Sequence, residues 1–304
     1  MSISHYIKDI GRGKDGARHL SRAHAADLFG QLLDGEVTDL EVGAFCLAMR
    51  IKGETPTEMA GFLDATHQRL RTIPTHNGPT VVLPSYNGAR KLPVLTPLLA
   101  LLLSRQGLAV VVHGSATEDR RVSTQNVLLA LELPELTAIN SIASGEVQFA
   151  PTTLLCPGLA RLLDVRRVVG LRNSAHSLVK LMNPCDGPAI VVGSYTHPEY
   201  AVAMTETQKL MFATALLLRG TEGEPVADPR RTPAMDAIHA GICTRVQEAQ
   251  TGSLAQLPDL PALDAASTAR WTQAVLGGQL PVPDPIAQQV AHIVRLSEKM
   301  RTTP

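Results

Sequence analysis

Residues 81–114 (VVLPSYNGARKLPVLTPLLALLLSRQGLAVVVHG) constrain the fold more than any other part of the chain. The ends of this stretch, residues 81–83 and 108–112, are short apolar runs rich in β-branched residues, which is typical of buried strands. Between them, the pair Thr96-Pro97 marks the start of a helix that Gly107 ends. Two strands joined by so short a helical connection predict a parallel, right-handed β-α-β unit.

The loop after the first of these strands carries candidate ligand-binding groups. Because ligands of open α/β sheets bind beyond the carboxyl ends of the strands, we expect residues 85–91 and 113–115 to line one crevice. Arg90 and Lys91 lie close to the start of the next helix, where an anion is favoured. The loop has a single glycine, Gly88, so it is neither a dinucleotide-binding fingerprint nor a Walker loop.

The composition restricts the classes of function. The chain has 304 residues, of which 44% are hydrophobic and 18% charged, and this is typical of a globular protein with a large core. The net charge is zero and aromatic residues make up 3%, so a nucleic-acid partner would need a local basic face and would not find a base-stacking platform. The four cysteines are widely spaced, and no apolar signal or membrane-spanning run is present, so we expect a cytoplasmic protein that makes no membrane contact.

Two regions outside the central stretch are expected to be helical. Residues 21–70 read as three closely connected helices, two of which start with capping-box patterns at Thr38 and Thr55. Residues 152–183 form the second region, where the only acidic residue is Asp164, whereas a solvated helix normally mixes both signs. The cations of this second region are Arg161, Arg166, Arg167, Arg172 and Lys180.

Motifs for metal or nucleophilic chemistry are weak. The chain lacks H-E-x-x-H, paired cysteines and the G-x-S-x-G elbow. Glu222 and Glu224 lie in a loop after an expected strand and are weak candidates for holding Mg²⁺, although charge on a solvated loop explains them equally well. Arg120 and Arg121 lie in the same loop region as the crevice.

The order of these segments resembles the anthranilate phosphoribosyltransferase family, and more closely its YbiB-type, DNA-binding branch. The resemblance covers most of the chain and includes the K-G-E-T turn at residues 52–55 and the H-G pair at residues 113–114. It implies an α/β fold with a helical dimerisation domain, formed by residues 1–75 and a returning segment 152–183, and a mostly parallel α/β domain at residues 76–304. A third piece resembles the family segment R-x-x-L-G-x-R-T-x-x-N, on which Arg166, Gly170, Arg172 and Asn173 fall.

Departures from the catalytic members argue against phosphoribosyl transfer. Where those members carry G-T-G-G-D for phosphoribosyl pyrophosphate, residues 84–88 of this chain read P-S-Y-N-G, so the backbone cannot wrap a pyrophosphate closely. The N-x-S-T contact has become residues 93–96, and the lysine of K-H-G has become Val112. The D-E pair that holds Mg²⁺ in the family is missing in that form near residues 223–226.

We therefore expect a non-catalytic homodimer that binds single- or double-stranded DNA, or RNA, without sequence preference and without a cofactor, as the branch implies. Phosphate contacts need only lysine and arginine. The expected basic groove comprises Arg161, Arg166, Arg167, Arg172, Lys180, Arg90 and Lys91. The expected anion crevice comprises Tyr86, Asn87, Gly88, Arg90, Lys91, Thr96, His113, Gly114, Arg172 and Asn173.

The alternative is an enzyme, namely a glycosyl- or phosphoribosyltransferase or a phosphorylase. It would act on a small acceptor with phosphoribosyl pyrophosphate and Mg²⁺. In that case Arg90, Lys91, His113 and Arg172 would bind phosphate, and Glu222 and Glu224 would hold the metal.

Overall fold

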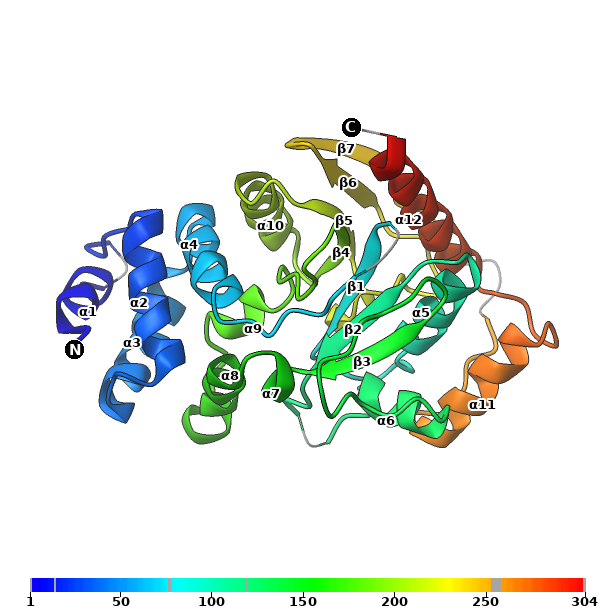
Figure 1. Ribbon diagram of the computed structural model, residues 1–304, viewed down its shortest axis with the longest axis horizontal. Coiled ribbons are helices and arrows are strands. Elements are labelled where there is room, and N and C mark those ends of the chain that lie inside the picture. Colours follow the sequence, from blue (N-terminus) through cyan, green and yellow to red (C-terminus); the bar gives the residue numbers. More distant parts are fainter. Residues whose placement is uncertain (1, 14, 76–77, 119, 253–257, 303–304) are drawn as a thin grey trace.

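The computed structural model describes residues 2–13, 15–75, 78–118, 120–252 and 258–302. Figure 1 shows an elongated molecule with a helical bundle around the amino-terminus at one end and a twisted sheet with its own helices at the other. This confirms the predicted fold class, a helical amino-terminal part with a mostly parallel α/β part. The boundary expected at residues 75/76 adjoins residues 76–77, which lie outside the described residues.

The helical part is organised around three phenylalanines. The rings of Phe29 and Phe62 stack at 4.6 Å, and Phe45 packs edge-on against both. The capping boxes predicted at Thr38 and Thr55 are present. The helices are α1 (Ser4–Ile10), α2 (Arg22–Asp34), α3 (Asp39–Lys52) and α4 (Pro56–His67), of which α1 was not expected from the sequence.

A returning segment packs against this bundle from far along the chain. It contains α7 (Thr152–Leu155), α8 (Pro157–Val169) and α9 (Ala175–Leu178). At Gly158 a side-chain methyl group would overlap the carbonyl group of Leu33, so the start of α8 fits against the end of α2 only as glycine. Arg161 strengthens this junction by donating from Nη2 to the Leu33 oxygen at 2.9 Å.

The sheet has seven strands in the order β3-β2-β1-β4-β5-β6-β7. The first five strands of this order are parallel. They include the predicted β-α-β unit, in which α5 (Thr96–Arg105) connects the parallel neighbours β1 and β2. The strands are β1 (Thr80–Ser85), β2 (Val110–Gly114), β3 (Val147–Pro151), β4 (Ala189–Tyr195), β5 (Thr214–Arg219), β6 (Met235–His239) and β7 (Ile242–Gln247).

The antiparallel hairpin β6–β7 was not predicted. Its two-residue turn is Ala240-Gly241, and both residues adopt positive φ, at 50° and 75°. Hairpin turns of this shape are usually signalled by Asn-Gly or Asp-Gly, and alanine carries no such signal. The pair Ala240-Gly241 therefore did not indicate a hairpin turn in the sequence.

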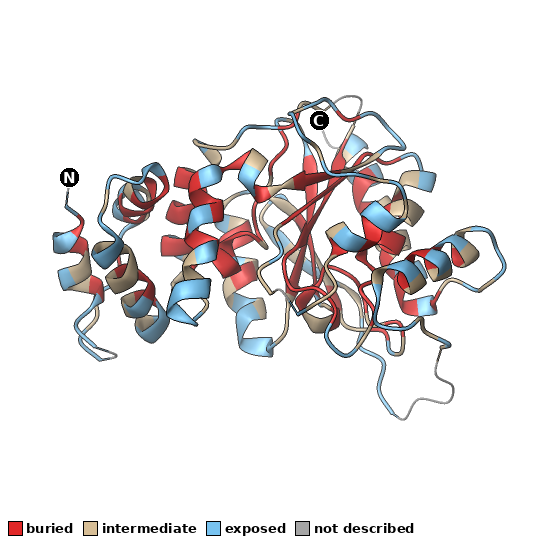
Figure 2. Ribbon diagram, turned by 90° about the horizontal axis from the view of Figure 1, so that it is seen from below, coloured by how far each residue is buried: buried red, intermediate tan, exposed pale blue. Residues whose placement is uncertain are grey.

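Both faces of the sheet are covered, as expected of parallel strands. Val81 and Leu83 pack toward α5 and α12, whereas Val82 packs toward the side of the helical part. Figure 2 shows the central strands buried, with exposed residues on the outer helices. The edge strand β7 is only partly buried. The remaining helices are α6 (Thr124–Ala130), α10 (Pro198–Leu210), α11 (Ala265–Leu276) and α12 (Asp284–Thr302). Among the described residues, no helix is long and apolar enough to cross a membrane.

Candidate functional site

The candidate site lies at the carboxyl ends of β1 and β2. In the parallel register Ser85 is opposite Gly114, and a side chain at Gly114 would overlap the Ser85 carbonyl group. The loop 85–91 and the start of the loop after β2 are therefore brought together. The turn that follows β5 packs onto the same edge, because its residues bond to the loop 85–91.

The carboxylate of Glu224 occupies the backbone N–H donors of the loop 85–91. Its Oε1 accepts from the amides of Asn87 at 2.7 Å and Gly88 at 2.8 Å. Its Oε2 accepts from the hydroxyl groups of Ser85 and, at 3.2 Å, Thr96. Glu224 is 1% exposed, so this carboxylate is an internal anion in a buried set of donors.

Glu222 fills the second half of the same loop. Its carboxylate accepts from the amides of Arg90 at 2.6 Å and Lys91 at 3.0 Å. Glu222 adopts a left-handed backbone with φ 54°, which is strained for a residue other than glycine. Asn87 holds the turn in place through a bond of 2.9 Å from Nδ2 to the Glu222 carbonyl oxygen. The donors that would face a phosphate are thus occupied by the chain itself.

The two carboxylates do not fit a Mg²⁺ site in this arrangement. Each points at amide hydrogens, which would repel a cation, whereas Mg²⁺ requires free carboxylate oxygens in octahedral geometry. Within the described ranges, no group of three His, Cys, Asp or Glu side chains is placed to hold a metal ion.

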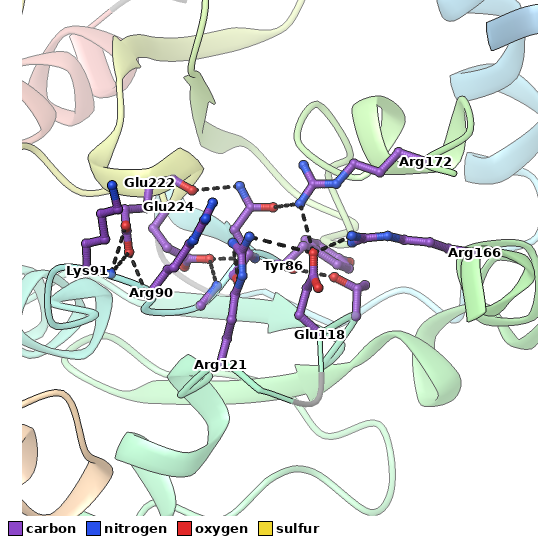
Figure 3. Close-up of polar contacts among 12 residues, drawn as sticks. Tyr86, Arg90, Lys91, Glu118, Arg121, Arg166, Arg172, Glu222 and Glu224 are labelled. Carbon is purple, nitrogen blue, oxygen red and sulfur yellow. Dashed lines mark hydrogen bonds and ion pairs between the residues drawn. The ribbon is translucent and has the colours of Figure 1, made fainter. Parts of the chain in front are cut away.

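Three arginines from separate segments converge beside this filled loop, and we call Arg121, Arg166 and Arg172 the arginine cluster. The Nη2 atoms of all three face Oε1 of Glu118, with Arg166 in direct contact, Arg121 at 3.7 Å and Arg172 at 3.9 Å. Asn87 joins the cluster to the loop, because it accepts from Arg172 at Oδ1 and from Arg121 at its backbone oxygen, both at 3.2 Å. Figure 3 shows Arg166 and Arg172 reaching Glu118 from the side of α8.

The cluster has a local excess of positive charge. Burial lowers the pKa of Arg172, and the charges of Arg166 and Arg121 lower it further. Burial raises the pKa of Glu118, but the bond from Arg166 and the charges of the cluster outweigh burial and hold that pKa below its ordinary value. Glu118 is therefore ionised at neutral pH, and it balances only part of the charge around it.

The predicted basic residues do not all lie together. Arg166 and Arg172 belong to the cluster, and Arg167 is exposed on α8 with a bond of 3.1 Å to the Ala116 oxygen. The side chains of Arg90 and Lys91 are exposed and lie beside Glu222.

Arg161 and Lys180 lie elsewhere and make internal contacts. Arg161 is tied to the end of α2, away from the cluster. Lys180 lies next to the turn after β5, where its Nζ donates to the carbonyl groups of Gly223 at 3.1 Å and Ser194 at 3.3 Å. Burial lowers the pKa of Lys180 to about 8. These two residues therefore support the architecture, and their part in the predicted basic groove stays a prediction.

Several residues expected in the anion crevice are instead part of the core. His113 is fully buried, its Nδ1 bonds to the Tyr86 hydroxyl at 2.8 Å, and burial lowers its pKa to about 3. Asn173 donates to the Leu162 oxygen at 2.7 Å and shapes the turn between α8 and α9. Thr96 and Gly114 are buried as well. These residues build the walls of the crevice.

Glu118 and the role of Arg121 were missed by the sequence analysis. Arg121 was noted in the loop region of the crevice, but nothing marked it as a partner of Arg166 and Arg172. Arg50 of α3 was also missed, and its charge acts on Arg172. The only sequence feature at Glu118 and Arg121 is a short run of acidic and basic residues after a strand, and such runs usually belong to ordinary solvated loops.

Comparisons with known proteins agree with this architecture. Residues 4–69 match the model of the helical bundle domain of the glycosyl transferase family. The chain is 39% identical to YbiB of Escherichia coli (strain K12), covering 96% of this chain and 93% of that protein. It is 30% identical to an anthranilate phosphoribosyltransferase of Leifsonia xyli subsp. xyli, over 86% of this chain and 76% of that protein.

Solved structures of anthranilate phosphoribosyltransferases share the fold. The enzyme from Thermus thermophilus superposes with a TM-score of 0.75 at 20% identity, covering 97% of this chain and 88% of the other. The enzyme from Saccharomyces cerevisiae, solved in complex with PRPP and Mg, gives a TM-score of 0.72 at 15% identity, covering 98% and 88%.

The internal carboxylate predicts a stability effect. Glu224→Gln replaces one acceptor oxygen with a donor facing other donors, so the free energy of unfolding should fall by about 2–3 kcal/mol. Denaturant unfolding measures the loss. Glu298→Gln, a change at an exposed position on α12, is the matched control and should leave stability unchanged. Equal stabilities of the two variants would contradict the role given to Glu224.

Proposed function

Since this chain belongs to the anthranilate phosphoribosyltransferase family, we propose that it is a member whose pyrophosphate site is filled by its own carboxylates and that it binds nucleic acid instead. The ligand is DNA or RNA, contacted through phosphates and without sequence preference. The observation that carries this proposal is the arginine cluster beside loop amides already occupied by Glu222 and Glu224.

Two features support binding without transfer. Phosphoribosyl transfer releases pyrophosphate from the ribose carbon, so an enzyme must bind and stabilise that leaving group with free backbone donors and a metal. Here the donors of Asn87 and Gly88 are bonded to a buried carboxylate. The arginines and lysines at the surface could still bind a polyanion such as nucleic acid. Contacts to its phosphates depend mainly on charge and require less precise geometry than catalysis does. The basic surface consists of Arg90, Lys91, Arg121, Arg166, Arg167 and Arg172.

We also propose that the protein is a homodimer joined through the helical part. Helix α3 buries Phe45 and Met49, yet Leu40, Leu47 and Ile51 on its other side are 84%, 49% and 54% exposed. Their spacing of seven and four residues places them on one face of the helix. An apolar helix face of this kind is typical of an interface. A two-fold dimer would double the number of basic residues and strengthen binding through avidity.

The proposed compartment is the cytoplasm. Nucleic acid is available there, and free thiols persist in its reducing conditions. Cys46, Cys156 and Cys185 are free and buried, and Cys243 is free and partly buried. This arrangement agrees with a reducing environment.

Binding to nucleic acid should depend steeply on salt. The wild-type protein should shift a single-stranded DNA oligonucleotide, and the double variant Arg166→Ala/Arg167→Ala should reduce the slope of log affinity against log salt by roughly one to two. Fluorescence anisotropy at several salt concentrations measures the slope. Arg270→Ala, an exposed arginine on α11, is the control and should keep the wild-type slope. Salt-insensitive binding, or none, would refute the proposal.

The dimer should depend on the exposed face of α3. Leu47→Glu/Ile51→Glu places two charges in the proposed interface, so light scattering should report a monomer. Val202→Glu is the control, because Val202 is 69% exposed on α10, outside that face. A monomeric wild-type protein, or a double variant that stays dimeric, would contradict this assignment.

The enzymatic alternative makes the opposite prediction for a small ligand. Calorimetric titration with phosphoribosyl pyrophosphate and Mg²⁺ should give no binding heat, because Glu222 and Glu224 occupy the amide donors that the pyrophosphate would need. The Thermus thermophilus enzyme provides the positive control for the assay. Micromolar binding by this chain would restore the transferase interpretation.

A further inference from the structure

The arginine cluster differs from the rest of the basic surface because its charges point inward to a single atom. Oε1 of Glu118 faces the guanidinium groups of Arg121, Arg166 and Arg172. A general polyanion-binding surface needs only cations spread along a groove. Convergence on one oxygen defines the position of one bound anionic group.

The charge at this position is incompletely balanced. Among the described residues, three guanidinium groups face the single carboxylate of Glu118, which leaves an excess of two positive charges. Nη1 of Arg166 is buried and has no hydrogen-bond partner among these residues. The side chain of Arg50 adds a further positive charge that acts on Arg172. A buried donor and an unbalanced charge both point to an anion that is more highly charged than a carboxylate.

We propose that the arginine cluster is a receptor for a terminal phosphate of a nucleic acid strand, and that Glu118 is a built-in competitor which the phosphate displaces. This inference rests on the proposed function. A phosphodiester has one negative charge, so exchanging Glu118 for it would leave the charge balance unchanged. A terminal phosphomonoester has nearly two negative charges at neutral pH and free oxygens for several guanidinium groups.

The surroundings of Glu118 agree with an exchange of this kind. Glu118 lies in the loop after β2, and its side chain is 26% exposed, so it has a path into solvent. Glu118 and Arg121 border a small hollow that is also lined by Ser115 and Thr117. Asn87 anchors both Arg121 and Arg172 and thereby keeps them in place after Glu118 leaves. With Glu118 in place the hollow has room for about one water molecule, so a phosphate group can enter only after the Glu118 carboxylate has moved out.

The test compares strands of one sequence that differ at the end. Fluorescence anisotropy at fixed ionic strength is measured with single-stranded DNA carrying a 5′-phosphate, a 3′-phosphate or only hydroxyl ends. The wild-type protein should bind at least one phosphorylated strand about tenfold more tightly than the hydroxyl strand. Inorganic phosphate, added at matched ionic strength, should remove this advantage if the phosphate group itself is recognised, and an unaffected advantage would overturn that assignment.

Variants separate the competitor from the receptor. Glu118→Gln should tighten binding of the phosphorylated strand, because the internal anion is gone, and Arg121→Ala should abolish the preference while weaker binding to all strands remains. Arg120→Ala is the matched control, because Arg120 is exposed in the same loop, and it should keep the preference.

The outcomes distinguish this inference from the proposed function. Salt-sensitive binding with equal affinities for all three strands, in the wild type and in Glu118→Gln, would overturn the terminal-phosphate site and leave nucleic-acid binding intact. No binding of any strand at low salt would overturn both.

Discussion

The bonds from the backbone amides of the loop 85–91 to Glu222 and Glu224 determine what this site can do. Four amides of the loop between β1 and α5 together form an anion-binding arrangement. The two amides of Asn87 and Gly88 are buried, and buried donors of this kind must be satisfied. In this chain a neighbouring turn satisfies them. The strained backbone of Glu222 is held by the same bonds. The carboxylate of Glu224 has thereby become part of the folded core.

Because carboxylates of the chain occupy the loop amides, the groups left to meet a ligand are the cations near the surface of the crevice. Once the amides are taken, Asn87 serves as a link between the filled loop and the arginine cluster, and Lys180 supports the turn from below. The remaining positive charge lies at the mouth of the crevice around Glu118. This edge of the sheet therefore presents cations at its surface, whereas its loop amides are bonded to carboxylates of the chain.

Much of the fold could be predicted because local signals and global fold agree. The apolar runs of β1 and β2, the proline near the start of α5 and the capping boxes of α3 and α4 each match the structure. The hairpin β6–β7 was missed because alanine occupies a turn position that requires positive φ. Arg161 and Lys180 also bond to backbone oxygens, which charge density along a sequence does not reveal.

The sequence alone determined the family, the parallel β-α-β centre and the loss of the glycine-rich loop, because each of these depends on residues close together in the chain. The tertiary structure decided the rest. Glu224 reaches the loop across 137 residues to Asn87, and Glu118 meets arginines from two other segments. Such pairings depend on which loops the strand order brings to one edge of the sheet. Glu222 and Glu224, which the sequence offers as metal ligands or solvated charges, therefore serve in the structure as acceptors for the loop amides.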